Sequence, residues 1–149
     1  MIIDSHCHLN YEPMSLSLKE TINRANADGV KYLLTISTED KSFDKILKIV
    51  SDYKCVFGSY GIHPHEAKNH TNINQDIILK KINMSNKIIG IGETGLDFYY
   101  NHSDKNIQKS LFIKHIRSCQ ETSKPLIVHS RNAENETYEI LNSYKNNDL

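Results

Sequence analysis

Residues 87–100, KIIGIGETGLDFYY, carry the pattern from which the fold of this chain is inferred. The apolar run at 88–91 predicts a strand buried on both faces, as the strands of parallel sheets are. Gly90 and Gly92 would weaken such a strand unless another group must come close to it. Glu93 falls at the expected end of the strand, and ligands gather at the C-terminal ends of strands in α/β folds.

Four further apolar runs predict strands at residues 2–8, 30–37, 55–60 and 125–129. Apolar residues recur at helical spacing at 15–28, after a cap at Thr38, at 77–82, at 104–122 and after 130–133. Strand and helix therefore alternate along the chain, which predicts βαβ units and a parallel sheet. The expected fold class is α/β.

Residue types that bind metals stand at four of the expected strand ends. His6 and His8 are two residues apart in an extended segment, so their side chains point the same way. His63, Glu93 and His129 follow later strands. Because parallel strands end at one edge, these groups are expected to converge, as in the active site of a (β/α)8 barrel. At each position the alternative is a surface or loop residue without a role.

The loop at residues 61–65, GIHPH, places a rigid proline between His63 and His65. Both histidines are candidates for proton transfer or for binding a substrate phosphate. The alternative is a polar loop with no function. The loop after the first strand contains histidines where a dinucleotide-binding fold needs a glycine-rich phosphate loop, so a nucleotide cofactor is rejected.

Three imidazoles and a carboxylate are the kinds of side chain that form a metal site. A metal there would support hydrolysis, because it lowers the pKa of a bound water and polarises the electrophile. Two neighbouring metals could share Glu93 and hold both the attacking and the leaving oxygen of a phosphodiester.

Composition excludes several other classes. The 149 residues suit one domain, residues 1–149, and 18 basic residues balance 18 acidic ones, so no global basic field attracts nucleic acid. The three cysteines are widely spaced, which argues against a disulfide framework or a zinc ribbon. The sequence contains neither a signal peptide nor a membrane-spanning run, so a cytoplasmic protein is expected.

Four motifs, in this order, resemble the TatD family of metal-dependent deoxyribonucleases, within the amidohydrolase-type barrels. They are residues 4–9 (DSHCHL), 61–65 (GIHPH), 92–98 (GETGLDF) and 125–131 (PLIVHSR), and Gln108 and Phe112 fit as well. The resemblance covers nearly the whole chain. It implies a TIM-type (β/α) barrel, here truncated to about five βα units.

The resemblance also implies roles for particular residues. It makes His6, His8, Glu93 and His129 ligands of one or two divalent metals, which would be magnesium, manganese or zinc. It assigns His63 to the scissile phosphate or to a proton in transit, beside Glu93 as the second catalytic group. His65 and Arg131 become substrate-binding candidates, with Asp97 bracing the loop, and DNA is the implied substrate.

Departures from the family pattern qualify these expectations. A complete member would have roughly 250 residues and eight strands, with a later histidine ligand and a late aspartate. Asn132 also stands where an acidic residue is common. Five strands cannot close a barrel and leave open edges. We therefore expect self-association or a complementing chain, and weak or absent hydrolysis by the chain alone.

Three functions stay open on the sequence. The first is a hydrolase acting on ester bonds, a deoxyribonuclease cleaving DNA phosphodiesters with metal-activated water. The second is an amidohydrolase of another specificity, which a metal-bridging carboxylated lysine would favour. The third is a metal-binding remnant without catalysis.

Overall fold

The computed structural model describes residues 1–100 and 102–145. Its core is one sheet of five parallel strands whose spatial order follows the chain. The strands are β1 (Ile2–Cys7), β2 (Val30–Thr35), β3 (Val56–Tyr60), β4 (Ile88–Asp97) and β5 (Leu126–Arg131). All five predicted strands are therefore confirmed; β4 continues further than expected, and the other four differ by one or two residues at their ends.

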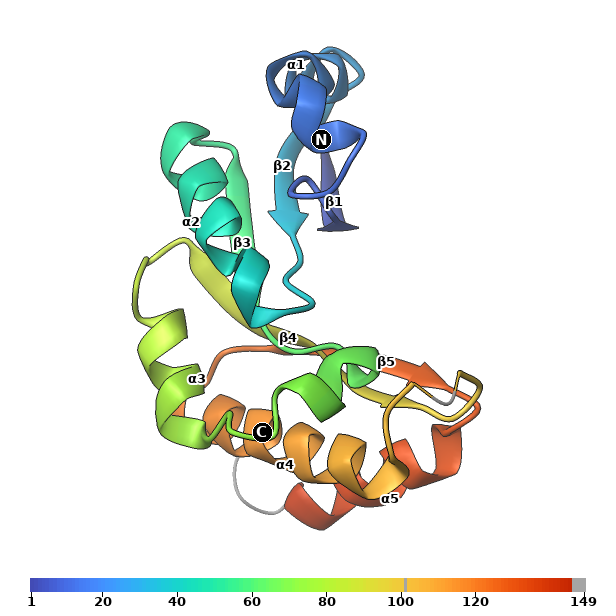
Figure 1. Cartoon of the computed structure of the whole chain (residues 1–149). Coiled ribbons are helices and arrows are strands. Elements are labelled where there is room, and N and C mark those ends of the chain that lie inside the picture. Colours follow the sequence, from blue (N-terminus) through green and yellow to red (C-terminus); the bar gives the residue numbers. More distant parts are fainter. Residues whose placement is uncertain (101, 146–149) are drawn as a thin grey trace.

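Helices connect the strands and lie along the outer side of the bent sheet (Figure 1). They are α1 (Leu18–Ala27), α2 (Phe43–Asp52), α3 (Gln75–Ile82), α4 (Lys105–Thr122) and α5 (Glu134–Tyr144), with short 3-10 turns η1 (Met14–Ser17), η2 (Asp40–Ser42) and η3 (Pro64–Asn69). The sheet curls, so that β1 and β2 run in a different direction from β4 and β5 in this view. The result is five βα units of a TIM-type barrel, as expected.

The core lies between the sheet and the helices and follows from helical spacing of apolar residues. In α2, Phe43, Ile46 and Val50 are buried, and they pack with Val56 of β3. Helix α4 begins at a side-chain cap, because the Asp104 carboxylate accepts hydrogen bonds from the first backbone N–H groups. The expectation that Thr38 caps α2 was wrong: η2 intervenes and α2 begins at Phe43.

Strand β4 is longer than the sequence indicated. It continues to Asp97, so Glu93 lies inside the strand instead of at its end. Two glycines with positive φ, Gly92 (135°) and Gly95 (140°), permit this course. A Cβ atom at Gly92 would lie 2.3 Å from the carbonyl oxygen of Ile127, and one at Gly95 would lie 2.1 Å from that of His129. The expected close approach of another group to the β4 glycines is confirmed, and that group is β5.

The inner face of the sheet is apolar and open. Leu33 packs in the core on the helix side, so its neighbours Tyr32 and Leu34 face the other way. Together with Ile3, Phe57 and Ile89 they line an open depression of about 470 Å³. Parallel sheets are normally covered on both faces. In the part of this chain that the structure describes, only the outer face of the sheet is covered by helices, and the inner face remains exposed.

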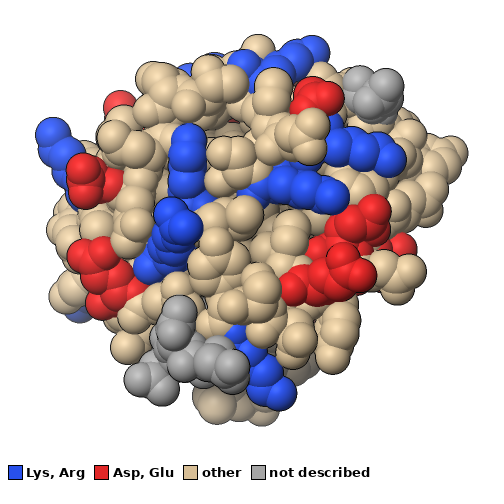
Figure 2. Space-filling view, turned by 90° about the horizontal axis from the view of Figure 1, so that it is seen from below, with Lys and Arg blue, Asp and Glu red and all other residues tan. Residues whose placement is uncertain are grey.

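The outer surface has mixed charge. Viewed from below, basic and acidic side chains are interspersed over the helical side (Figure 2). Within residues 1–100 and 102–145, no helix combines the length and the apolar character that crossing a membrane requires.

Candidate metal centre

The C-terminal halves of the strands bring the predicted site residues together. His6 lies in β1 and His8 just after it, His63 and His65 stand in the loop after β3, Glu93 is in β4 and His129 in β5. These side chains line an open pocket of about 410 Å³, together with Tyr11, Thr38 and Glu66. The convergence expected from parallel strands is therefore found.

Two groups of possible metal ligands share one carboxylate. His6, His8 and Glu93 form the first, and His63, Glu93 and His129 form the second; within each group the ligand atoms lie within 4.8 Å of one another. His6 Nε2 is 3.4 Å from Glu93 Oε2, whereas His129 Nδ1 is 3.2 Å from Glu93 Oε1. The two oxygens of Glu93 thus face different groups.

The donor chemistry of both groups suits a divalent cation. Imidazole nitrogen with carboxylate oxygen is a common ligand set for zinc and manganese. In the described part of the chain, the ion pairs recorded for Glu93 are with imidazoles alone. Burial raises the pKa of Glu93, but the hydrogen bond with His129 and nearby imidazoles outweigh it and lower that pKa. The carboxylate is therefore held in the ionised form that a metal needs.

The backbone orients one ring for ligation. His8 Nδ1 lies 3.1 Å from the carbonyl oxygen of Ile36. A carbonyl only accepts, so Nδ1 donates and Nε2 keeps its lone pair free. Cys7, between the two histidines, faces away and donates to the carbonyl oxygen of Leu34. The alternation expected for residues 6–8 therefore holds.

His63 stands inside the second group. Its Nε2 is 3.2 Å from His129 Nδ1. Burial, reinforced by the positive charge that His129 can carry, lowers the pKa of His63 to about 4. His63 is thus neutral at neutral pH and able to accept a proton or to ligate.

Asp97 joins two of the histidines from behind. Its Oδ2 is 2.7 Å from His65 Nε2 and 3.0 Å from His129 Nε2. Burial raises the pKa of Asp97, yet the hydrogen bond from the Tyr100 N–H and those of the two imidazoles bring it down to about 2. His129 is held between Glu93 and Asp97, and its pKa is raised, first by the hydrogen bond with Glu93. Asp97 therefore positions the rings as well as bracing the loop.

A glutamine from α4 fixes Asp97 in turn. Gln108 is buried; its side-chain oxygen accepts from the Asp97 N–H at 2.8 Å, and its nitrogen donates to the Asp97 carbonyl at 3.1 Å. The same nitrogen donates to the carbonyl of Ser103, whose hydroxyl donates to the carbonyl of His65. The motif resemblance included Gln108, but its function as a clamp on β4 becomes visible only in three dimensions.

Arg131 lies over aromatic rings. Its guanidinium carbon is 4.2 Å from the ring centre of Tyr99 and 4.6 Å from that of Tyr100. Among the described residues no ion pair of Arg131 with a carboxylate is found. The sequence motifs assigned no role to the two tyrosines. Their signal was two successive tyrosines directly after the motif at residues 92–98.

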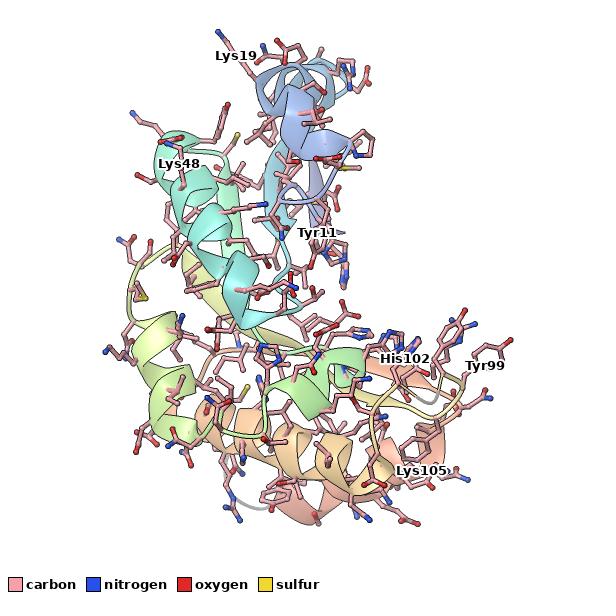
Figure 3. The ribbon with its side chains drawn as sticks, in the orientation of Figure 1. Tyr11, Lys19, Lys48, Tyr99, His102 and Lys105 are labelled. Atoms are coloured by element: carbon pink, nitrogen blue, oxygen red, sulfur yellow. The ribbon has the colours of Figure 1, made fainter. Side chains whose placement is uncertain are left out.

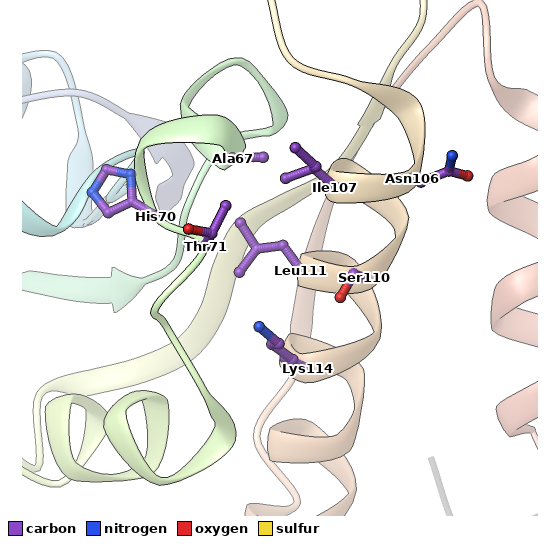
Figure 4. A pocket seen from close by; sticks show the side chains of 8 residues that line it. All are labelled: Ala67, His70, Thr71, Asn106, Ile107, Ser110, Leu111 and Lys114. Carbon is purple, nitrogen blue, oxygen red and sulfur yellow. The ribbon is translucent and has the colours of Figure 1, made fainter.

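Other conspicuous features are structural. His115 is fully buried; Nδ1 donates to the carbonyl of Leu111 and Nε2 accepts from the N–H of Ile62. A separate pocket of about 250 Å³ lies between η3 and α4 (Figure 4). Its two titratable side chains are engaged, with Lys114 Nζ donating to the carbonyl of Ile73 and His70 Nδ1 to that of Glu66. Neither the surroundings of His115 nor this pocket contains a cluster of side chains suited to catalysis.

The fold and the donor groups define the class: part of a (β/α) barrel with candidate metal ligands at the C-terminal side of its strands. The family model described as TatD related DNase matches residues 3–149. The chain belongs to this family.

Individual relatives agree with the family assignment. An uncharacterized metal-dependent hydrolase of Buchnera aphidicola subsp. Baizongia pistaciae is 39% identical over 94% of this chain and 53% of its own length. The deoxyribonuclease Tat-D of Schizosaccharomyces pombe is 30% identical over 83% of this chain and 43% of its own length. The chain therefore spans about half the length of the curated relatives it matches.

A solved structure supports the fold. The crystal structure of YjjV, a TatD homologue from Escherichia coli, superposes with a TM-score of 0.86 at 24% identity, covering 96% of this chain and 56% of that one. At this identity the similarity establishes the fold alone.

Proposed function

We propose that this chain provides the metal centre of a TatD-type deoxyribonuclease, which hydrolyses DNA phosphodiesters with metal-activated water. The observation that carries the proposal is the sharing of Glu93 by two groups of ligands. His6, His8, Glu93 and His129 would hold one or two divalent ions, with His63 beside them. Such ions would supply an activated water and polarise the phosphate.

The residues of the chain have distinct tasks in this proposal. Glu93 bridges the two groups through its separate oxygens. Neutral His63 accepts a proton or contacts the phosphate. His65, which Asp97 holds at 2.7 Å, faces the same pocket and is a substrate-binding candidate. Arg131 contributes positive charge near this site.

A specific observation favours a phosphodiesterase over an amide or lactone hydrolase. The residues that line the pocket include carboxylates and imidazoles but no lysine that could be carboxylated as a metal bridge. Glu93 occupies the bridging position instead. The relative from Schizosaccharomyces pombe is named a deoxyribonuclease, which agrees with this choice.

The test combines metal binding with cleavage. Mn²⁺ binding would be measured by calorimetric titration, and cleavage of single-stranded DNA would be followed with Mg²⁺ or Mn²⁺. We expect Glu93→Gln to lose both, because both groups depend on this carboxylate. Glu66→Gln is the matched control, since Glu66 lines the same pocket but belongs to neither group.

The alternatives give different results. Metal binding without cleavage would identify a metal-binding remnant, and cleavage of an amide or lactone but not of DNA would identify another hydrolase. If the unaltered protein binds no metal, or if Glu93→Gln binds as well as the unaltered protein, the proposal is wrong.

A further inference from the structure

A row of rings leads from the candidate metal centre to the rim of the site. The ring centres of His129 and His63 are 4.3 Å apart, and those of His63 and His65 are 4.4 Å apart. His65 is followed by Tyr100 at 5.5 Å, and Tyr100 by Tyr99 at 4.7 Å. The tyrosines therefore stand next to the metal centre in space, at the end of a continuous series of contacts.

The outer end of the row is exposed and positively charged. Tyr99 is 56% and Tyr100 40% exposed, so two adjacent aromatic rings are open to solvent. The guanidinium of exposed Arg131 lies over both rings. Figure 3 shows Tyr99 projecting outward beyond His102 at the loop after β4. His102 stacks on Tyr100 with ring planes at 16°, which leaves Tyr99 as the more accessible surface.

The exposed rings are held in position by the same residue that orients the histidines. The N–H groups of Tyr99 and Tyr100 donate to Asp97 Oδ1 at 3.1 and 3.0 Å. Asp97 itself is buried and clamped by Gln108. A stacking surface fixed in this way loses little conformational freedom when a ligand binds.

We propose that Tyr99, with Tyr100 and Arg131, forms a stacking platform for a nucleobase of single-stranded nucleic acid beside the metal centre. Planar rings with an adjacent guanidinium bind bases of any sequence through stacking, while the cation attracts the phosphate backbone. A paired base in a duplex is already stacked on both faces, so the ligand is single-stranded. This inference rests on the proposed function and specifies its substrate.

The experiment measures stacking without cleavage. A short single-stranded oligonucleotide containing 2-aminopurine is titrated with the full chain in EDTA, and both fluorescence quenching and anisotropy are recorded. Stacking of the probe base on a tyrosine quenches its fluorescence. We expect Tyr99→Ala to lose the quenching and to weaken binding about tenfold or more, the range typical of base–aromatic stacking.

Two variants separate stacking from a general effect on the fold. Tyr99→Phe keeps the ring and should retain quenching and affinity. Tyr138→Ala removes another exposed tyrosine (68% exposed), on α5, and should change neither. Circular dichroism of Tyr99→Ala verifies that the variant is folded.

The outcomes distinguish this proposal from the proposed function. Quenching that is lost in Tyr99→Ala and kept in Tyr99→Phe supports the platform. When the same 2-aminopurine is placed in a duplex, its already reduced fluorescence should not fall further on addition of the protein. Equal quenching by Tyr99→Ala, or none by the unaltered protein, overturns it. Hydrolysis of bis(p-nitrophenyl) phosphate with Mn²⁺, a substrate without bases, reports the metal centre separately.

Discussion

At the scale of single residues, Asp97 has the largest number of functions near the candidate metal centre. Asp97 connects His65 and His129, holds the backbone of the following tyrosines, and is itself held by Gln108. A carboxylate behind a ligating imidazole fixes its orientation and raises its basicity. Asp97 therefore links the metal centre with the exposed rim.

Asp97→Asn is expected to weaken metal binding without removing a ligand. The amide cannot present two acceptor oxygens to the imidazoles and the loop, so His129 loses its fixed orientation. We expect a loss of about 10- to 100-fold in Mn²⁺ affinity, measured by calorimetry. Asp44→Asn, an exposed change in α2, should leave the affinity unchanged; unchanged affinity in Asp97→Asn would contradict the positioning role.

Buried His115 makes stability depend on pH. Burial lowers its pKa from 6.5 to about 4 in the folded protein, so between these values the unfolded chain binds more protons. Stability from His115 is complete above pH 6.5 and falls as the pH decreases toward 4, by at most about 1.4 kcal/mol per pH unit.

The measurement is urea unfolding at several pH values between 7 and 5, where we expect the free energy of unfolding to decrease with acidity. His115→Gln removes the titrating group and should reduce the slope of stability against pH, even if it lowers stability overall. Equal slopes for both proteins would show that other groups cause the dependence.

At the scale of elements, the contact between β4 and β5 decides the geometry of the second ligand group. Gly95 pairs with His129 in the sheet, and the backbone of β5 occupies the space that a side chain at Gly95 would need. Because Glu93 and His129 sit on these two strands, their separation depends on this close pairing.

Gly95→Ala should be far more harmful than the corresponding change at Gly29. Both glycines have positive φ, 140° and 91°, so both substitutions carry backbone strain of roughly 1–3 kcal/mol. At Gly29 the new Cβ would meet nothing within 4 Å, whereas at Gly95 it would lie 2.1 Å from the His129 carbonyl oxygen.

We therefore expect Gly95→Ala to lower the denaturation midpoint more than Gly29→Ala and to reduce Mn²⁺ affinity as well. Gly29→Ala should affect stability alone. Equal losses in the two variants would mean that strain, and not the proximity of β5, limits this position.

At the scale of the whole molecule, the sheet has one covered and one open face. The helices bury the outer side, while Ile3, Tyr32 and Ile89 remain 39–56% exposed on the inner side. Exposed apolar surface that is contiguous promotes association. On the outer side, the face seen in Figure 2 carries interspersed basic and acidic side chains.

Ile89→Lys should reduce concentration-dependent association. The added charge makes burial of the inner face against another protein surface unfavourable. Sedimentation velocity over a range of protein concentrations would measure the effect. Met84→Lys is the control, since Met84 is also exposed (54%) but does not line the inner depression; association that is absent or unaffected by Ile89→Lys would contradict this expectation.

The sequence by itself determined the order and type of the elements and the residues that converge. Apolar periodicity depends on local geometry, and parallel strands necessarily end at one edge, so His6, His8, His63, Glu93 and His129 could be grouped from their positions alone. Tertiary structure alone decided that β4 extends past Glu93 and that Glu93 is shared by two ligand groups. It also decided that Asp97 joins His65 to His129, and that Arg131 covers Tyr99 and Tyr100. These features arise from the packing of β5 against the β4 glycines and of α4 against the end of β4, contacts between segments that no local pattern encodes.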